Sequence, residues 1–357
     1  MRAVICRSFD GIDALEFGKL PDPVAGPGQV LIDVHAAALS FMDTLMVAGR
    51  YQMRPALPFA PGSDAAGVVL AVGDGVRHVR VGDRVACGHW HGGMAECMVA
   101  PGSAVVKLPD GVGFEIGATV RYAYGTARYA LETRAQLSPG ETVFVSGAAG
   151  GVGMAAVDLA RQTGATVIAG TSSATRGEVA RQQGAAHAID YSCEPVRDRL
   201  LELTQGRGVD VFFDNVGGAL FGTVSRVMAW GGRILPVGFT SGEVLSLAMN
   251  LPLLKNYGVV GCYWGAWAER QPQQSRAADE QLFAAVAQGS LRPHVSEVLP
   301  MSSFADGLQR IARHQATARI VLRVKQTPHT TGASPRESSP SSTAWSAMRS
   351  AAHPCCT

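Results

Sequence analysis

Positions 143–153 read Val143-Phe-Val-Ser-Gly-Ala-Ala-Gly-Gly-Val-Gly153, and this stretch decides the fold. It joins a short β-rich run to Val152–Gln162, whose apolar residues have helical spacing. A strand, a glycine turn and a helix in that order form the context of the dinucleotide-binding fingerprint. The glycines allow close approach of a pyrophosphate, and the helix N-terminus supplies free N–H groups. The predicted phosphate contacts are Gly150, Gly151, Val152 and Gly153.

The surrounding sequence favours this fingerprint over its alternative, an ordinary glycine-rich turn. Ala148 stands where the strict pattern has its first glycine, so the stretch alone is a weak signal. However, strands and helices alternate from residue 142 to 262, which is typical of βαβ units and a parallel sheet. Strands are expected at Thr142–Ser146, Thr166–Gly170, His187–Ile189, Val209–Asp214, Arg233–Val237 and Gly258–Cys262, and helices at Val152–Gln162, Arg176–Gln183, Val196–Leu203 and Leu220–Ala229. Six such strands match a complete doubly wound dinucleotide fold.

The residues on either side of this region are organised differently. Residues 1 to about 120 contain short apolar runs between turn signals, which is typical of a barrel-like β domain. Residues 266–324 contain two predicted helices and two predicted strands, too little for a separate domain. We expect them to pack onto the first domain. The Ser- and Pro-rich stretch at residues 325–357 is expected to be disordered because it offers little apolar surface to bury.

Composition excludes several classes of protein. The chain has 357 residues, enough for about two domains, and 47% of them are hydrophobic. The net charge is only +2, which argues against nucleic acid or a membrane surface as the main partner. No apolar run is long enough to cross a membrane, and no secretory signal is visible. Seven scattered cysteines without a CxxC pair fit a reducing cytoplasm.

The end of the second predicted Rossmann strand indicates which nicotinamide cofactor binds. An NAD site usually carries an acidic residue there to hold the ribose hydroxyls, but residues 169–176 contain none. Thr171, Ser172 and Arg176 instead offer hydroxyls and a cation that suit a 2′-phosphate. The sequence therefore favours NADPH. The alternative is that Arg176 is only a solvated residue in the first turn of a helix.

Four stretches together resemble the medium-chain dehydrogenase/reductase superfamily, and more narrowly its zinc-free quinone oxidoreductase (zeta-crystallin-like) branch. They are Leu57-Pro-Phe-Ala-Pro-Gly-Ser-Asp64, Val81-Gly-Asp-Arg-Val85, Gly147-Ala-Ala-Gly-Gly-Val-Gly153 and Leu253-Leu-Lys-Asn-Tyr-Gly-Val-Val-Gly261. The resemblance implies an α/β fold with a GroES-like β-barrel catalytic domain at residues 1–120, completed by residues 266–324. A Rossmann domain at residues 121–265 would lie between them, with the active site in the cleft. Members are commonly homodimers or homotetramers.

The same resemblance argues against zinc. Zinc-dependent relatives have a cysteine near Ser40 and a His-Glu pair where this chain has Ser63 and Asp64, and their four-cysteine lobe is missing. A catalytic zinc needs three good ligands, and these positions do not supply them. His89 and His91 are an alternative metal pair, although two histidines in a glycine-rich loop are more often plain surface residues.

Residues on the substrate side are carried over from the family by match. Ser40, Asp43 and Tyr51 would line that side of the cleft, with Ser40 standing where the family often has Asn. Ser40 would donate a hydrogen bond to the developing oxyanion. Asp43 could equally cap the following helix, and Tyr51 could be core packing.

Further cofactor contacts are also carried over. They are Thr126 at the start of a helix, Tyr191 near the adenosine, Asn215 to Gly217, and Val237, Gly238 and Phe239, the last two groups following strand ends. Trp264 either shapes the substrate pocket or packs between domains.

The expected reaction is one that NADPH drives without a metal, on a small-molecule electrophile. Transfer of a hydride to a quinone or another α,β-unsaturated carbonyl fits, because conjugation already activates the acceptor. An enoyl-thioester or enone reductase is the second hypothesis. The third is an NADPH-binding protein with little turnover.

Overall fold

The computed structural model describes residues 1–325. The predicted tail at residues 325–357 lies outside the described residues except for Lys325. None of the helices within residues 1–325 is both long and apolar enough to cross a membrane.

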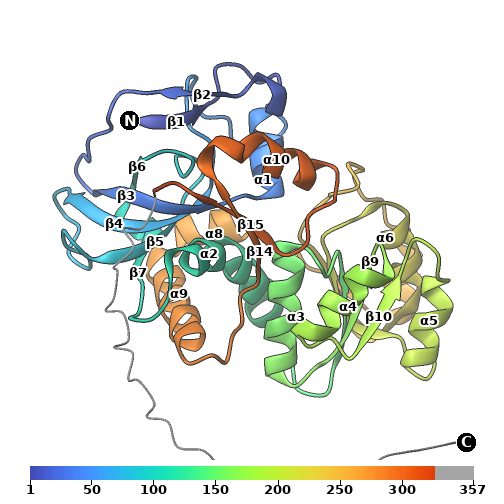
Figure 1. The fold of residues 1–357 in the computed structure, drawn as a ribbon. Helices are drawn as coiled ribbons and strands as arrows, with labels where there is room; N and C mark the ends of the chain where they lie inside the picture. The colour runs from blue at the N-terminus through green and yellow to red at the C-terminus, as the bar shows by residue number, and fades with distance from the viewer. Residues whose placement is uncertain (326–357) are drawn as a thin grey trace, which may run out of the picture. The chain divides into compact units, whose positions relative to one another are not determined.

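A six-stranded parallel sheet forms the centre of the dinucleotide fold (Figure 1). Its spatial order is β10-β9-β8-β11-β12-β13, which is the doubly wound order predicted from the sequence. The strands are β8 (Thr142–Ser146), β9 (Thr166–Thr171), β10 (His187–Asp190), β11 (Val209–Asp214), β12 (Met228–Pro236) and β13 (Gly258–Val259). All neighbouring pairs in this sheet are parallel, so every strand ends at the same edge.

Helices cover both faces of this sheet, because alternate strand residues point to opposite sides. Val143 and Val145 of β8 belong to the core shared with α2 and α3, whereas Phe144 packs with Phe212 in the core on the other face. The helices of this part are α2 (Phe114–Arg128), α3 (Gly151–Thr163), α4 (Ala174–Gln183), α5 (Val196–Leu203), α6 (Gly218–Val224) and α7 (Asn250–Lys255), with a π-helical turn (Tyr129–Arg134) and a 3-10 turn (Ser225–Val227).

A second, mostly antiparallel sheet has the order β14-β15-β3-β4-β5-β7, and β6 pairs with β3. Its strands are β3 (Gln29–Ala38), β4 (Asp64–Val72), β5 (Arg84–Gly88), β6 (Cys97–Pro101), β7 (Val105–Lys107), β14 (Val295–Pro300) and β15 (Arg319–Arg323), and β1 (Arg2–Ile5) pairs separately with β2 (Glu16–Lys19). Because β15 pairs with β3, the chain returns after the Rossmann sheet to complete the N-terminal one. The predicted α/β fold class, a barrel-like β part plus a doubly wound parallel sheet, is confirmed.

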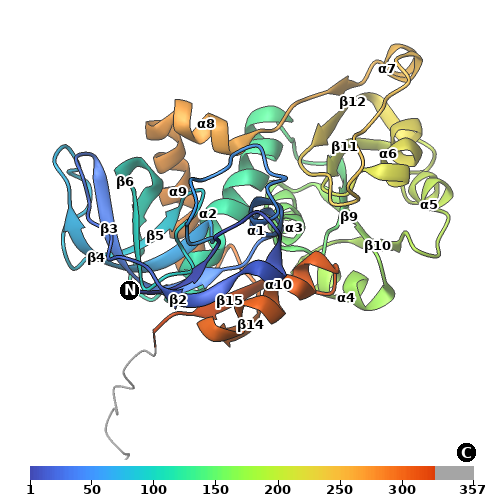
Figure 2. The ribbon, with the colours of Figure 1, turned by 90° about the horizontal axis from the view of Figure 1, so that it is seen from above.

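The remaining helices lie in the part of the molecule that holds this second sheet (Figure 2). They are α1 (Phe41–Val47), α8 (Trp264–Arg270), α9 (Pro272–Ala287) and α10 (Phe304–Ala312), with 3-10 turns at Ile12–Ala14, Gly102–Ala104 and Met301–Ser303. Helix α8 begins shortly after β13, so the chain passes from the Rossmann sheet to the second sheet through it.

Three local predictions differ from the structure. The helix expected at Leu220–Ala229 ends at Val224, since β12 already begins at Met228. The last Rossmann strand is only Gly258–Val259 rather than Gly258–Cys262. Helix α2, at 114–128, was not predicted in full. Most of its residues are buried, and all-round burial removes the amphipathic pattern by which a helix is recognised.

Candidate active site

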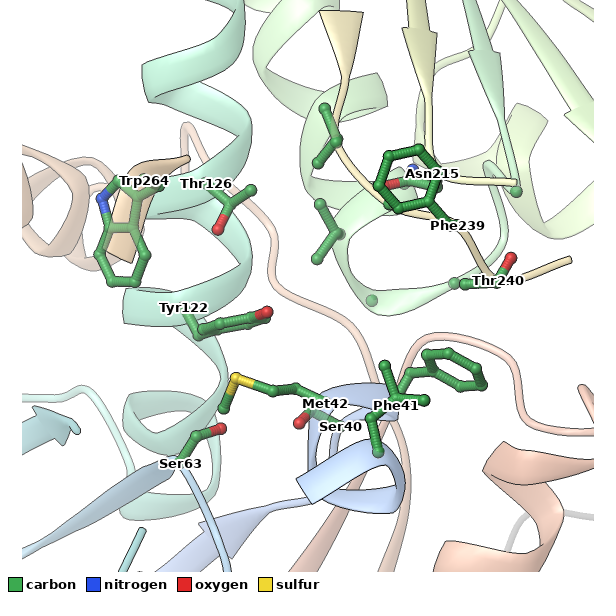
Figure 3. A pocket seen from close by; sticks show the side chains of 18 of the residues that line it. Ser40, Phe41, Met42, Ser63, Tyr122, Thr126, Asn215, Phe239, Thr240 and Trp264 are labelled. Atoms are coloured by element: carbon green, nitrogen blue, oxygen red, sulfur yellow. The ribbon is translucent and has the colours of Figure 1, made fainter. Parts of the chain in front are cut away.

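A cavity of about 780 Å³ lies where the two sheets meet, and it is lined from both of them. It contains the glycine loop, the ends of β9, β11 and β12, and residues of α1, α2 and α8 (Figure 3). Of the residues predicted from the sequence, Ser40, Tyr51, Thr126, Gly150, Gly151, Val152, Gly153, Thr171, Ser172, Arg176, Tyr191, Asn215, Val237, Gly238 and Phe239 line it. Asp43 and Gly217 do not. The structure therefore brings together in one cavity nearly all the residues that the sequence singled out.

The glycine loop forms the floor of the cofactor side. Gly147, with φ of 61°, takes the left-handed conformation that the turn needs. Ala148, which replaces the first glycine of the strict fingerprint, does not have a positive φ. Gly150 precedes the first turn of α3, whose N-terminus has no side-chain cap. A Cβ atom on Gly153 would overlap the carbonyl oxygen of Gly147, so glycine is required there for the helix to pack on the turn. The loop thus presents free backbone N–H groups to the cavity.

The far end of the cofactor side is polar and lies at the end of β9. Thr171 is buried, and the Ser173 hydroxyl caps α4 by accepting from the backbone N–H of Arg176 at 3.3 Å. The Arg176 guanidinium is half-buried and donates to the carbonyl oxygen of His314, in the segment after α10. Burial raises the pKa of Tyr191, while a hydrogen bond with Ser172 and the charge of Arg176 oppose that rise. Arg176 is therefore a fixed cation at this end rather than a freely solvated one.

The middle of the cavity is framed by loops that follow β11 and β12. One carboxylate oxygen of Asp214 accepts from the Ser146 hydroxyl at 2.6 Å and from the backbone N–H groups of Val216 and Gly217, both at 3.0 Å. The side-chain amide of Asn215 donates to the carbonyl oxygen of Ser146 at 3.1 Å. These bonds fix the loop at the end of the sheet. Gly217, with φ of 77°, is the residue before α6 and does not line the cavity.

Thr126 faces these loops across the cavity, but from a different place in its helix than predicted. It lies near the C-terminal end of α2 rather than at a helix start. In Figure 3, Thr126 and Tyr122 project from α2 toward the side of the cavity that holds Asn215 and Phe239. Tyr122 is a lining residue that the sequence reasoning missed. The signal was its spacing, because residues four apart on a helix share a face.

Ser40 and Asp43 form the cap of α1 at the substrate side. Ser40 is the N-cap residue, and the Asp43 carboxylate accepts from both its backbone N–H and its hydroxyl, each at 2.8 Å. Asp43 lies inside α1 and is fully buried, so it does not reach the cavity. The capping interpretation of Asp43 therefore holds, although the cap is reciprocal. In this geometry Ser40 donates its only hydroxyl proton to Asp43, which leaves none for an oxyanion.

Two phenols provide the hydroxyl groups at this end instead. Tyr51 is half-buried, hydrogen-bonds with Tyr122, and its ring centroid lies 6.2 Å from that of Trp90. Burial raises the pKa of Tyr51 to about 12, and burial raises that of Tyr122 still further. Both phenols are therefore protonated at neutral pH and act as hydrogen-bond donors.

Charged residues near this end are buried and paired. Arg319 contacts Asp64 at 2.6 Å, and Arg121 contacts Asp279 at 2.8 Å. Burial outweighs the attraction of Arg319 and raises the pKa of Asp64 to about 7. The Arg121 guanidinium also lies over the ring of Trp264, 5.4 Å from its centroid, so a cation borders the aromatic lining.

The two histidines considered as metal ligands lie near the cavity, with ring centroids 5.7 Å apart. Burial lowers the pKa of both rings, to about 4 for His89, so both are neutral at pH 7. Within residues 1–325 no group of three His, Cys, Asp or Glu side chains is placed to hold a metal ion.

Comparison with known proteins places this architecture in a family. Residues 26–110 match the alcohol dehydrogenase GroES-like domain, and residues 151–280 match the zinc-binding dehydrogenase family. The quinone oxidoreductase-like protein 2 homolog of Nematostella vectensis is 37% identical over 91% of this chain and 89% of its own length. A quinone oxidoreductase from Pseudomonas aeruginosa is 34% identical over 88% of this chain and 97% of its own length.

Solved structures agree with this placement. The quinone oxidoreductase of Pseudomonas syringae pv. Tomato has a TM-score of 0.84 and 32% identity, covering 90% of this chain and 99% of that one. A mycobacterial protein solved in complex with NADPH has a TM-score of 0.85 and 28% identity, covering 91% of this chain and all of that one. Fold and site thus define a medium-chain dehydrogenase/reductase, a class of oxidoreductases. Within that superfamily the chain belongs to the zinc-free quinone oxidoreductase branch.

The raised pKa of Asp64 predicts how stability depends on pH. The folded protein keeps a proton on this carboxyl up to about pH 7, whereas the unfolded chain releases it near the ordinary value of 3.8. Stability from this group is therefore present below about pH 4 and is lost as the pH rises toward 7. Asp64→Asn binds no proton, so the wild type's stability relative to this variant should shrink between pH 4.5 and 7.5 in urea unfolding.

Glu96→Gln is the matched control with the opposite sign. The backbone N–H of Arg2 and its guanidinium hold the pKa of Glu96 below its usual value. The wild type should therefore gain stability over Glu96→Gln as the pH rises to the ordinary glutamate pKa of 4.5. A wild-type advantage over Asp64→Asn that stays constant or grows toward pH 7.5 would show that Asp64 is ionised in the folded protein.

Proposed function

We propose that the protein is an NADPH-dependent, zinc-independent oxidoreductase that reduces a quinone or another conjugated carbonyl. The observation that carries the proposal is the continuity of the cavity. It runs from Arg176 and the glycine loop to the phenols of Tyr51 and Tyr122. A dinucleotide and a small flat acceptor would thereby share one enclosed space.

The residues of the cofactor side fit NADPH. The glycine loop would hold the pyrophosphate on its backbone N–H groups. The absence of a side chain at Gly153 lets the helix N-terminus pack closely on this turn. Arg176, Ser172 and Thr171 would hold the 2′-phosphate, and no acidic side chain lies between residues 169 and 176 to repel it. Thr126 and the loop around Asn215 would enclose the nicotinamide. When bound, NADPH supplies the hydride for the reduction. The mycobacterial relative solved with NADPH supports this assignment.

The substrate side would act by orientation and hydrogen bonding. Tyr51 and Tyr122 hydrogen-bond to each other, and the one hydroxyl proton left free by this bond would be donated to a carbonyl oxygen as negative charge develops on it. The high pKa values of both phenols keep their protons in place at neutral pH. The rings of Tyr51, Trp90, Tyr122 and Trp264 line this end of the cavity, which suits a flat acceptor.

Activity and metal content test this proposal together. The purified protein should oxidise NADPH with a quinone at the same rate with and without a chelator. Metal analysis should find far less than one zinc per chain, because Ser40 and Ser63 stand where zinc relatives have ligands. Tightly bound stoichiometric zinc, or loss of activity in chelator, would contradict zinc independence. Turnover of an enoyl-thioester but not of a quinone would favour the second hypothesis.

Arg176→Ala should weaken NADPH binding selectively. A hydrogen bond between ionised partners contributes roughly 1.5–3 kcal/mol, which is about ten- to a hundredfold in affinity. NADH lacks the 2′-phosphate, so its affinity should stay nearly unchanged. Fluorescence titration with both cofactors measures the difference.

Arg181→Ala is the matched control, because Arg181 lies on the same helix and pairs with Glu178 at the surface, at 3.5 Å. Equal losses for NADPH and NADH in Arg176→Ala would mean that the contact with His314 supports the fold rather than the phosphate. A wild type that prefers NADH would refute the assignment of this loop.

We also propose that the protein is a homodimer joined at the β13 edge of the Rossmann sheet. Within residues 1–325, strand β13 has a neighbour on one side only, so its other backbone edge is open in this part of the chain. Exposed apolar side chains lie on the neighbouring elements: Leu253 and Leu254 of α7 are 80% and 67% exposed, and Trp230 of β12, the strand paired with β13, is 75% exposed. Such a patch beside an open edge is typical of a subunit interface.

Light scattering tests the dimer. The wild type should have twice the chain mass of 37.3 kDa, and a Leu253→Asp, Leu254→Asp double variant should be monomeric. Val24→Asp is the control, because Val24 is 85% exposed but lies in the other sheet's domain. A monomeric wild type, or a double variant that remains dimeric, would place the interface elsewhere or remove it.

A further inference from the structure

Trp90 occupies a loop whose backbone is fixed. The loop follows β5, and its N–H groups donate to residues 60–63: His89 to Ser63 at 2.8 Å, Gly93 to Gly62 at 2.9 Å, and Met94 to Pro61 at 2.8 Å. Trp90 is half-buried and lines the cavity. Because the backbone around it is held by these bonds, the position of the indole depends on its side-chain contacts.

Helix α8 holds the indole at two points. The indole N–H donates to a carboxylate oxygen of Glu269 at 2.6 Å. The opposite edge of the ring rests on Gly265, where a Cβ atom would lie 2.6 Å from Cη2 of Trp90. Any larger residue at position 265 would clash with the indole, so glycine is required for this contact. Gly265 and Glu269 are four residues apart, so both contacts come from one face of α8.

The same helix contributes a second aromatic ring by a similar contact. Trp264 rests on Gly125 of α2, where a Cβ would lie 2.8 Å from its ring, and its centroid is 5.9 Å from that of Tyr122. Figure 3 shows Trp264 and Tyr122 at the same end of the cavity. Tyr51 lies on the other side of Trp90, with ring centroids 6.2 Å apart. The acceptor end is therefore bounded by rings whose places are set by two glycines.

We propose that Trp90, held by Glu269 and seated on Gly265, is the wall that limits the size of the acceptor. The inference rests on the proposed function and names a specificity-determining residue for it. A one-ring quinone fits in front of the indole, whereas an acceptor with additional fused rings meets it. The wall acts on the acceptor end alone, because none of these contacts involves the glycine loop or Arg176.

Two substitutions move the wall in opposite directions. Gly265→Ala places a methyl group where the indole edge rests and pushes the ring into the cavity. Trp90→Ala removes the wall. The measured quantity is the ratio of kcat/KM for 9,10-phenanthrenequinone to that for 1,4-benzoquinone, with NADPH saturating. One extra carbon in a pocket changes such a ratio by about tenfold or more. We expect the ratio to fall by about tenfold in Gly265→Ala and to rise by about tenfold in Trp90→Ala.

Gly222→Ala is the matched control, since Gly222 is a helical glycine of α6 with no atom near its Cβ position. It should leave the ratio unchanged. The dissociation constant for NADPH should stay within about twofold in every variant, as expected for contacts confined to the acceptor end. Glu269→Ala should raise the ratio, and Glu269→Gln, which keeps an oxygen to accept the indole N–H, should not.

The outcomes separate this inference from the proposed function. If the wild type reduces quinones but Gly265→Ala and Trp90→Ala leave the ratio unchanged, the wall is refuted and the function stands. The same holds if both variants shift the ratio in one direction. If the wild type oxidises NADPH with neither quinone and with no other conjugated carbonyl, the proposed function fails and the inference fails with it.

Discussion

The buried hydrogen bond from Arg319 to Asp64 holds the two sides of the cavity together. Arg319 begins β15, and its side-chain carbons lie against Gly151, where a Cβ would be 2.5 Å from Cδ. Its guanidinium reaches Asp64 at the start of β4, at 2.6 Å. The residue before it, Ala318, donates its N–H to the carbonyl oxygen of Ala149 at 2.7 Å. Two adjacent residues thus tie the glycine loop to the sheet that carries the substrate side. Removing Asp64 would leave the buried Arg319 guanidinium without its partner, and an unpaired buried charge costs ~3–5 kcal/mol.

Glycines serve the same architecture by letting large side chains approach the backbone. The side chain of Arg319 lies over Gly151. The ring of Trp90 lies over Gly265, and the ring of Trp264 lies over Gly125. In each case a Cβ would meet the neighbouring side chain at 2.8 Å or less. These positions lie in or beside helices, where glycine lowers helix stability. The close packing around the cavity explains why glycine is nevertheless present there.

Local signals made the Rossmann sheet predictable. Strand β8 and helix α3 could be predicted because a β-rich apolar run, the glycine loop and apolar residues at helical spacing follow one another directly. Helix α2 could not, because its buried residues face other elements on nearly all sides, and with it the positions of Tyr122 and Thr126 were missed or misplaced. The cap formed by Ser40 and Asp43 was readable from the spacing of Ser and an acid three residues on. Contacts between distant residues, such as the hydrogen bond from Arg319 to Asp64, 255 positions apart, leave no trace in local sequence.

The Ser40 hydroxyl donates its proton to Asp43, so another residue must donate the hydrogen bond to the substrate oxygen. A serine whose hydroxyl donates to a buried carboxylate has no second proton, unlike the amide that the family often carries at this position. Asp43 is buried, and burial raises its pKa, so the acid requires the two hydrogen bonds from Ser40 whenever it is ionised. Freeing the Ser40 hydroxyl would therefore leave a buried charge poorly satisfied. Burial keeps both Tyr51 and Tyr122 protonated, and their mutual hydrogen bond uses one hydroxyl proton, so the pair still has one proton to donate into the cavity. The chemistry of the substrate side thus depends on aromatic residues from two elements rather than on the helix cap that the sequence first suggested.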